Sequence, residues 1–213
     1  SSGEVKLAEV VQVNGGRVVR GLRHMEVPLV GTVPLQDIVG KALGEEMPKT
    51  RRAFLVISNE DLSYRDFSFP FTSPRKVAGA IRFEISTEYP SEEYSMDSIE
   101  IPSGEPGRKA FLAAIVRKEV LKERIRVAEA LGLKVVGITC DLSSLGNYFV
   151  DENDALVMDM GQHQTLFALY THRVPILVRG IPIGLGDLRR ETGEVRQEDL
   201  KPFRSEIKRT IHS

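Results

Sequence analysis

The sequence is almost without the residues that cross-link small folds. It contains one cysteine, Cys140, and no tryptophan in 213 residues. A single cysteine excludes an intramolecular disulfide and any metal site built from cysteine alone, and it suits a reducing compartment. We therefore expect cytoplasmic material, or the cytoplasmic part of a larger protein.

The sequence also lacks a charge excess of either sign and any long apolar run. The net charge is −1, so no overall field attracts the chain to nucleic acid or to anionic lipid. No stretch approaches the roughly 20 apolar residues of a membrane span. The start of the chain does not show the basic region and apolar core of a secretion signal. With 41% hydrophobic and 28% charged residues, the composition predicts a soluble globular protein without a nucleic-acid partner.

The first quarter of the chain has a strong hairpin signal. Residues 4–13 and 17–27 are rich in β-formers, and Asn14-Gly15 between them supplies the positive φ angles of a tight primed turn. Thr32 can then cap a helix in which apolar residues repeat at helical spacing from Leu35 to Met47. This pattern predicts a hairpin followed by a helix, and then a short buried strand over 52–58.

The middle of the chain predicts a compact unit of its own. Alternating and helical patterns give a strand, a helix, two strands, a helix and a strand, over 64–71, 73–85, 94–101, 110–116, 117–131 and 134–140. The order β-α-β-β-α-β is that of the split-βαβ unit. We expect this unit to be a subdomain inserted into the surrounding fold.

The last third repeats the pattern of the beginning. A short helix from Leu142, capped by Asp141, precedes three strands joined by short turns within 154–184, and a helix over 199–212 ends the chain. The first copy of this pattern is one strand short at its front, so we expect a first strand upstream of Ser1. The predicted division is 1–59 for the first half, 60–140 for the insert and 141–213 for the return helix and second half.

Several stretches in this order resemble the actin-like ATPase-fold proteins of bacterial secretion and pilus machines. The continuation of the first phosphate loop in the type IV pilus assembly protein M family is similar to SSGEVKLAEV. Type II secretion protein L has a strand ending in Pro-Phe before a helix that leads to Glu and a final Pro, which resembles FSFPFTSPRKVAGAIRFEISTEYP. Both families resemble RKEVLKERIRVAEALGLKVVGITCDLSSLGNYF and MDMGQHQTLFALYTHRVPILVRGIPIG. We favour the secretion protein because of the Pro-Phe segment.

The resemblance covers almost the whole chain and implies an α/β fold. The expected class is an actin-like, ribonuclease H-like duplicated domain with an inserted βαββαβ subdomain. In nucleotide-binding relatives, two acid-glycine hairpins embrace the phosphates with backbone amides, and their acids hold a magnesium ion, usually through water. The second hairpin is present here as Asp159, Gly161, Gln164 and Thr165. The first hairpin is missing from this sequence.

Two interpretations of this acid-glycine turn remain. It binds a nucleotide phosphate, or it retains only the geometry that ends a strand. We favour the second, because phosphate charge needs donors that converge from both sides. We therefore expect no cofactor, and Mg-ATP only if the pilus alternative is correct.

Other candidate sites are weaker. His163 has no second histidine, cysteine or carboxylate at ligand spacing, which predicts an exposed turn residue and no metal. The glycines of GIPIGLGDL, Gly180, Gly184 and Gly186, lack the Lys-Ser/Thr ending of a P-loop and favour a strand-to-helix turn. Cys140 ends an apolar strand and is interpreted as a core thiol. No convergent catalytic set is found.

The function implied by the resemblance is a non-enzymatic cytoplasmic scaffold of a type II secretion inner-membrane platform. Such a scaffold recruits the secretion assembly ATPase and connects it to inner-membrane components. Phe67, Phe69 and Phe71 are candidates for partner contact, although the inward face of a strand explains alternate positions equally well. The expected location is the cytoplasmic face of the bacterial inner membrane, and a homodimer is an open alternative.

Two alternative functions remain. The first is an ATP-binding pilus assembly protein of the M type, which grips a cytoplasmic peptide of a membrane partner. The second is a sugar-kinase-like phosphotransferase, which would need a catalytic acid near the junction of the halves, where Asp141 is the only candidate. Fold resemblance alone cannot choose among these chemistries.

Overall fold

The structure is a computed structural model that describes residues 2–28, 37, 39–41, 51–71, 73–146, 154–188, 198 and 200–212. The chain forms two compact units, each made of two separate stretches. The first unit comprises Ser1–Leu55 and Leu121–Ile138, and the second comprises Val56–Val120 and Thr139–Ser213. These units differ from the three segments predicted from the sequence, whose boundaries stay a prediction.

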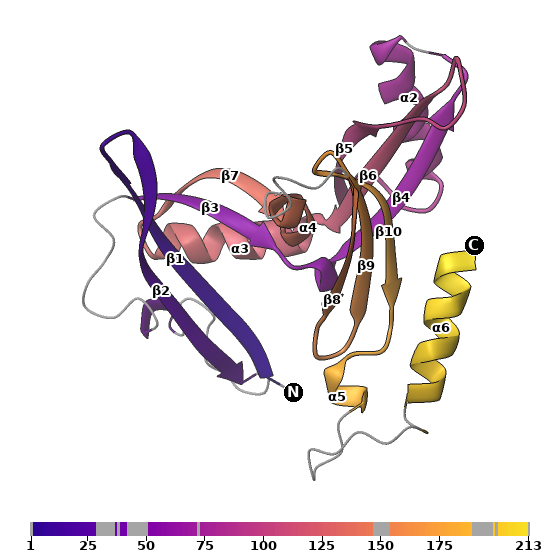
Figure 1. The fold of residues 1–213 in the computed structure, drawn as a ribbon. Helices are drawn as coiled ribbons and strands as arrows, with labels where there is room; N and C mark the ends of the chain where they lie inside the picture. Colours follow the sequence, from indigo (N-terminus) through magenta and orange to yellow (C-terminus); the bar gives the residue numbers. More distant parts are fainter. Residues whose placement is uncertain are drawn as a thin grey trace. The chain divides into compact units, whose positions relative to one another are not determined.

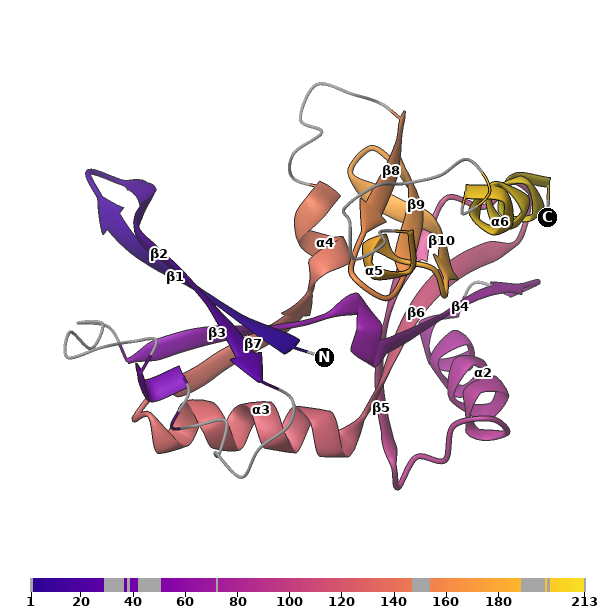
Figure 2. The same ribbon diagram turned by 90° about the horizontal axis from the view of Figure 1, so that it is seen from below.

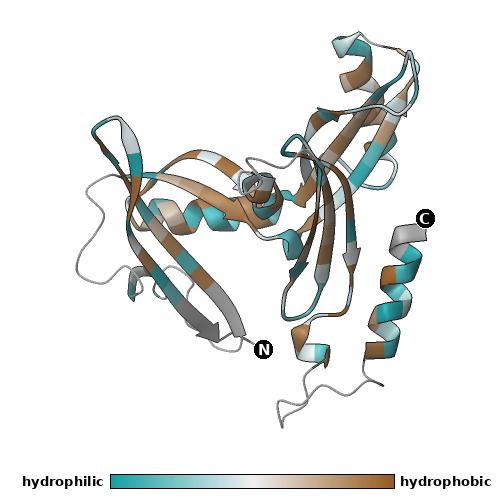
Figure 3. Cartoon of the chain, viewed as in Figure 1, coloured by the Kyte–Doolittle hydropathy of each residue, from teal (hydrophilic) through white to brown (hydrophobic). Residues whose placement is uncertain are grey.

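The first unit begins with the predicted hairpin. Strands β1 (Ser2–Val13) and β2 (Gly16–Pro28) pair antiparallel, with an irregularity between Glu9 and Val10. Asn14 and Gly15 have φ angles of 49° and 82°, the left-handed values that a primed turn requires. Apolar and polar residues alternate along both strands (Figure 3). The Asn-Gly signal therefore places this turn correctly.

A two-stranded sheet and a helix complete the first unit. Strand β3 (Arg52–Ile57) pairs with β7 (Lys134–Cys140), and the Lys134 amide donates to the Arg51 carbonyl. Helix α3 (Lys118–Ala130) lies alongside both strands in both views (Figures 1 and 2). Asp37 and residues 39–41 are helical, as expected after the hairpin, whereas the Thr32 end of that predicted helix lies outside the described residues.

The second unit contains the first part of the predicted insert. Strands β4 (Leu62–Phe69), β5 (Tyr94–Ile101) and β6 (Lys109–Arg117) form an antiparallel sheet of order β4-β6-β5, and a 3-10 turn, η1 (Asn59–Asp61), precedes it. The element order is the one predicted. Its last strand, β7, pairs with β3 instead of extending this sheet. The pairing with β3 suits Gly137, because a side chain there would overlap with the Phe54 ring.

Helix α2 (Pro74–Ser86) covers one face of this sheet. Val77, Ile81 and Ile85 recur every four residues and are all buried, so they form one face of the helix. Proline at the first helical position and Ser73 before it mark the predicted start. Ala78, which follows Val77 directly, is exposed.

A second sheet in the same unit holds the predicted three strands. These are β8 (Asp154–Met160), β9 (Thr165–Thr171) and β10 (Val174–Ile181), in the order β10-β9-β8. Helix α5 (Leu185–Leu188) follows β10, and α6 (Leu200–His212) lies beside β10 (Figure 1). Phe203 of α6 is buried against Phe167, Ile181 and Leu188. The three strands and the final helix are therefore confirmed.

The short helix α4 (Asp141–Leu145) corrects one prediction. Its N-cap residue is Cys140 and not Asp141. Cys140 has an extended backbone, with φ −117° and ψ 159°. Asp141 lies in the first helical turn, where a negative charge interacts favourably with the helix dipole. The remainder of the predicted helix, 147–149, lies outside the described residues.

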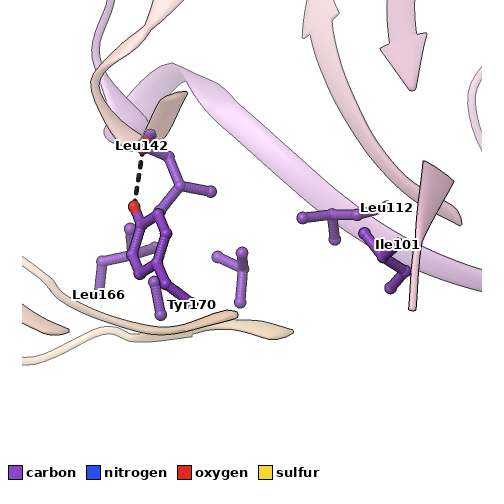
Figure 4. Close-up of a cluster of buried hydrophobic side chains, with 7 residues drawn as sticks. Ile101, Leu112, Leu142, Leu166 and Tyr170 are labelled. Carbon is purple, nitrogen blue, oxygen red and sulfur yellow. Dashed lines mark hydrogen bonds between the residues drawn. The ribbon is translucent and has the colours of Figure 1, made fainter. Parts of the chain in front are cut away.

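One core joins the two sheets of the second unit. Tyr170 is 1% exposed and its hydroxyl donates to the Leu142 carbonyl over 2.7 Å (Figure 4). The buried members of this cluster come from β5, β6, α4, β9 and β10: Ile101, Leu112, Leu142, Leu166, Ala168, Tyr170 and Val178. β10 also contacts all three strands of the β4-β6-β5 sheet. In the part of the chain that the structure describes, no helix is long and apolar enough to cross a membrane.

Candidate functional site

The acid-glycine turn connects β8 to β9. Asp159 is exposed near the end of β8, and the last paired residues of the two strands are Met160 and Thr165. The Gly161 amide donates to the Gln164 carbonyl over 2.9 Å and closes the turn. Gly161 and Gln164 thus lie within one tight turn, and Asp159 lies two residues before Gly161 in β8.

The segment after β10 packs directly on this turn. The Leu185 amide donates to the Gly161 carbonyl and the Gly186 amide to the Gln162 carbonyl, each over 2.8 Å. Because these bonds join two backbone segments far apart in sequence, they fix the turn independently of side-chain identity. We call residues 182–186 the bracing loop.

Thr165 belongs to this bracing and not to an open site. Its side chain is 0% exposed, and its hydroxyl donates to the Ile183 carbonyl over 2.7 Å. The hydroxyl hydrogen is therefore engaged inside the protein in this structure. Thr165 therefore has a structural role at the base of the turn, and its assignment to a nucleotide site stays a prediction.

Gly184 explains how the bracing loop approaches so closely. A Cβ atom at this position would overlap with the backbone of Gln162 and His163. A Cβ atom at Gly186 would lie 2.9 Å from the Gln162 carbonyl oxygen. Both glycines form the strand-to-helix connection that the sequence favours, whereas Gly180 lies within β10 in open space.

Two backbone amides of the turn are without a hydrogen-bond partner in the described part of the chain. Gln162 and His163 are exposed, and their amides have no hydrogen-bond partner among the residues that the structure describes. Such paired amides are the groups that bind phosphate oxygens in backbone nests. The Glu60 carboxylate lies 3.6 Å from the position that a Cβ atom would take at Gly161. The nucleotide-binding assignment of Asp159, Gly161 and Gln164 stays a prediction.

A buried polar cluster lies at the start of β4. Asn59 is 6% exposed; its side-chain oxygen accepts from the Tyr64 hydroxyl over 2.6 Å, and its Nδ2 has no partner. Burial raises the pKa of Tyr64, and the Cys140 thiol, followed by the Asp141 carboxylate, raises it further. Burial, with the Cys140 thiol next, also raises the pKa of Tyr170. Both tyrosines are therefore neutral hydrogen-bonding groups near pH 7.

Cys140 itself fits the predicted core thiol in part. It is half-buried, packs against the cluster around Tyr170, and its sulfur lies 3.2 Å from the Ser143 hydroxyl. Over the described ranges, no group of three or more histidine, cysteine, aspartate or glutamate residues could hold a metal ion. His163 lies exposed in its turn, as expected.

The three phenylalanines proposed for partner contact belong to a core. Phe69 is 9% exposed, and its ring stacks on Phe67 and Phe71 with centroids 6.1 and 5.3 Å away. Because positions two apart on a strand point to one side, all three rings face α2 and pack with Val77 and its neighbours. This packing favours the alternative interpretation, an inward strand face, and the partner-contact assignment of the three residues stays a prediction.

Sequence reasoning missed a different aromatic residue. Phe83 is 71% exposed on α2. It lies two positions from Ile81 and Ile85, on the side of the helix away from the buried stripe. The helical period alone could have identified it, because Phe83 does not fall on the stripe formed by Val77, Ile81 and Ile85.

No protein-family profile and no curated protein matches this sequence. Among solved structures, the PilM–PilN type IV pilus biogenesis complex has a TM-score of 0.75 at 18% identity, covering 98% of this chain and 72% of that one. The cytoplasmic domain of EpsL, an inner-membrane component of the type II secretion system of Vibrio cholerae, has a TM-score of 0.54 at 13% identity, covering 84% of this chain. This chain spans 66% of that domain, just under two thirds of its length.

A third structure is a protein from Bacteroides thetaiotaomicron described as having an actin-like ATPase fold and unknown function, with a TM-score of 0.45 at 8% identity. It covers 93% of this chain and 69% of that one. The likeness to the pilus and secretion proteins is one of fold. It confirms both resemblances found in the sequence and the expected actin-like α/β fold class.

Proposed function

We propose that this chain is a non-catalytic adaptor of a type IV pilus or type II secretion machine at the cytoplasmic face of a bacterial inner membrane. The observation that supports the proposal is the shared fold, which extends over 98% of the chain for the pilus protein and 84% for the secretion protein. The first of these structures is a PilM–PilN complex, and the second protein is an inner-membrane component. By analogy, the adaptor binds the cytoplasmic segment of an inner-membrane partner and recruits the assembly ATPase.

The structure and the sequence favour different members of this pair. The Pro-Phe segment favours the secretion protein, whereas the higher TM-score and coverage favour the pilus protein. The rings of that segment lie in the core between β4 and α2, where packing explains them. We therefore give the pilus-type adaptor the greater weight.

The braced turn supports a role in holding rather than in chemistry. The Thr165 hydroxyl and the Gly161 amide, which would otherwise face a phosphate, are engaged inside the protein. The donors that remain lie on one side of the turn. A fold that uses its loop groups to fix its own shape suits a rigid binding platform.

The test is direct binding of the purified 213-residue chain to its cognate partners. One arm uses the cytoplasmic segment of the inner-membrane partner, and the other uses the N-terminal domain of the assembly ATPase. We expect saturable binding in at least one arm, with a scrambled segment of the same composition as the control. Absence of binding in both arms would contradict the proposal, provided that a cooperative melting transition shows the chain to be folded.

Nucleotide binding at the acid-glycine turn is a second candidate function. It is favoured by the two amides of Gln162 and His163, which have no partner in the described structure, next to the exposed carboxylate of Asp159. A ligand that binds only the folded state raises its stability, by about 2.7 kcal/mol at 100 times the Kd. Melting curves with and without Mg-ATP test this, and Asp159→Asn is the matched variant. A melting temperature that saturating Mg-ATP leaves unchanged would rule this candidate out.

A further inference from the structure

Helix α2 presents an unusual face to solvent. The side opposite its buried stripe carries three cations and one aromatic ring, Arg75, Lys76, Arg82 and Phe83, and the exposed acid Glu84 lies at its margin, next to the stripe. All four residues are exposed. Positions 76, 79 and 83 follow one another at helical spacing, as do positions 75, 79, 82 and 86, so the three cations and Phe83 share one side of the helix. We call this surface the α2 basic face.

Neither ion pairing nor position in the helix gives evidence that these cations stabilise the fold. None of the three forms an ion pair with a described residue, whereas Arg65 of the same unit pairs with Glu88 over 2.6 Å. Arg75 and Lys76 also lie in the first turn of the helix, where the helix dipole disfavours positive charge. Their placement therefore opposes the local electrostatics of α2.

The exposure of Phe83 indicates an apolar contact on the α2 basic face. Large aromatic side chains gain free energy by leaving water, yet this ring is 71% exposed. It is not the margin of the core, because Val77, Ile81 and Ile85 form that core on the other side of the helix. Departures from local patterning are expected at functional or strained sites.

We propose that the α2 basic face contacts the surface of an anionic lipid bilayer. The three cations meet the negative headgroups, and the Phe83 ring enters the interface between them. This mode is that of interfacial helices, which combine basic residues with an aromatic or aliphatic anchor. The chain as a whole has a net charge of only −1, so the attraction to anionic lipid comes from the cations of this face. The proposal goes beyond the adaptor function, because it requires no protein partner.

Shape favours a bilayer over an acidic peptide. The α2 basic face is the convex outside of a single helix. Peptides bind in grooves or along free sheet edges, where several of their side chains find pockets. A flat or gently curved lipid surface can contact all four side chains of a convex helix at once. The contact is weak. Each cation near an anionic membrane raises the partition coefficient of the protein onto the membrane about five-fold, so three cations raise it about 100-fold.

The experiment is sedimentation of the full 213-residue chain with lipid vesicles. Vesicles of phosphatidylcholine alone are compared with vesicles that also contain phosphatidylglycerol, at low and high salt. We expect binding only to the anionic vesicles, weakened by salt because exposed charges are screened. The triple variant Arg75→Gln, Lys76→Gln, Arg82→Gln should bind about 100-fold more weakly. Phe83→Ser should also lose binding.

The matched control removes the same charge elsewhere. Arg117→Gln, Lys122→Gln, Arg126→Gln changes three exposed cations outside α2. We expect this variant to bind like the unchanged chain. Equal loss in both triple variants, or equal binding to neutral and anionic vesicles, would overturn the proposal. Binding to polyglutamate but not to vesicles would also overturn it, in favour of an acidic protein.

A folding readout separates loss of contact from loss of structure. Removing Arg75 and Lys76 relieves an unfavourable interaction with the helix dipole, so the melting temperature should stay the same or rise. A variant that unfolds more easily would contradict the reasoning about these charges. The vesicle result is also independent of partner binding, which is measured without lipid.

Discussion

Gly184→Ala is the substitution that tests the bracing loop. Gly184 is buried, and a Cβ atom there would overlap with the backbone of Gln162 and His163. Backbone atoms cannot rotate away as a side chain can. The methyl group must therefore push the bracing loop away from the turn.

The magnitude follows from what this displacement breaks. The Leu185–Gly161 and Gly186–Gln162 bonds are 2.8 Å long, and their donors are the two residues directly after Gly184. A shift large enough to clear the overlap removes both bonds, at about 1 kcal/mol each. Overpacking adds about 1–3 kcal/mol. We expect the free energy of unfolding to fall by about 3–5 kcal/mol in total.

The chain offers a matched control for this substitution. Gly180 lies in β10, four residues away, and a Cβ atom there would meet nothing within 4 Å. Gly180→Ala should change the free energy of unfolding by less than about 0.5 kcal/mol. Urea unfolding followed by circular dichroism measures both variants. A Gly184→Ala protein as stable as Gly180→Ala would refute the close contact between the loop and the turn.

Four further substitutions probe the rest of the structure. Tyr170→Phe leaves the Leu142 carbonyl without its 2.7 Å partner and should cost about 1–3 kcal/mol by urea unfolding. Burial raises the pKa of Tyr170, so above pH about 10 the unfolded chain releases a proton that the folded chain keeps. The unfolding free energy should then fall as pH rises above that value, and fall less steeply in the Phe variant. Phe69→Ala removes a stacked core ring and should cost about 3–5 kcal/mol, whereas Phe83→Ala should change stability by less than about 0.5 kcal/mol; equal effects would contradict the assigned burial. Gly15→Ala forces a side chain to a φ of 82° and should cost about 1 kcal/mol, which an unchanged melting temperature would disprove.

Local rules predicted the elements that local interactions form. Asn14-Gly15 predicts its turn because few other residues adopt two consecutive positive φ angles. The spacing of Val77, Ile81 and Ile85 predicts α2 because one helical face must be buried. The order of the elements across the chain was predicted for the same reason.

The errors arose where distant segments meet. The pairing of β7 with β3 depends on contacts such as Gly137 with Phe54, which no periodicity encodes. The burial of Thr165 depends on a loop that follows two strands later. For that loop the only sequence signal was Gly184, and a glycine does not reveal which backbone will lie against it. The cap of α4 was misplaced by one residue, the usual uncertainty at a helix end.

Calorimetric titration of the intact chain with the cytoplasmic segment of its inner-membrane partner is the decisive measurement. An adaptor should bind that segment saturably, with one segment per chain and a Kd of micromolar order or tighter, in the absence of nucleotide and lipid. A folded chain that gives no heat of binding with this segment or with the assembly ATPase domain would show that the shared fold serves another function here.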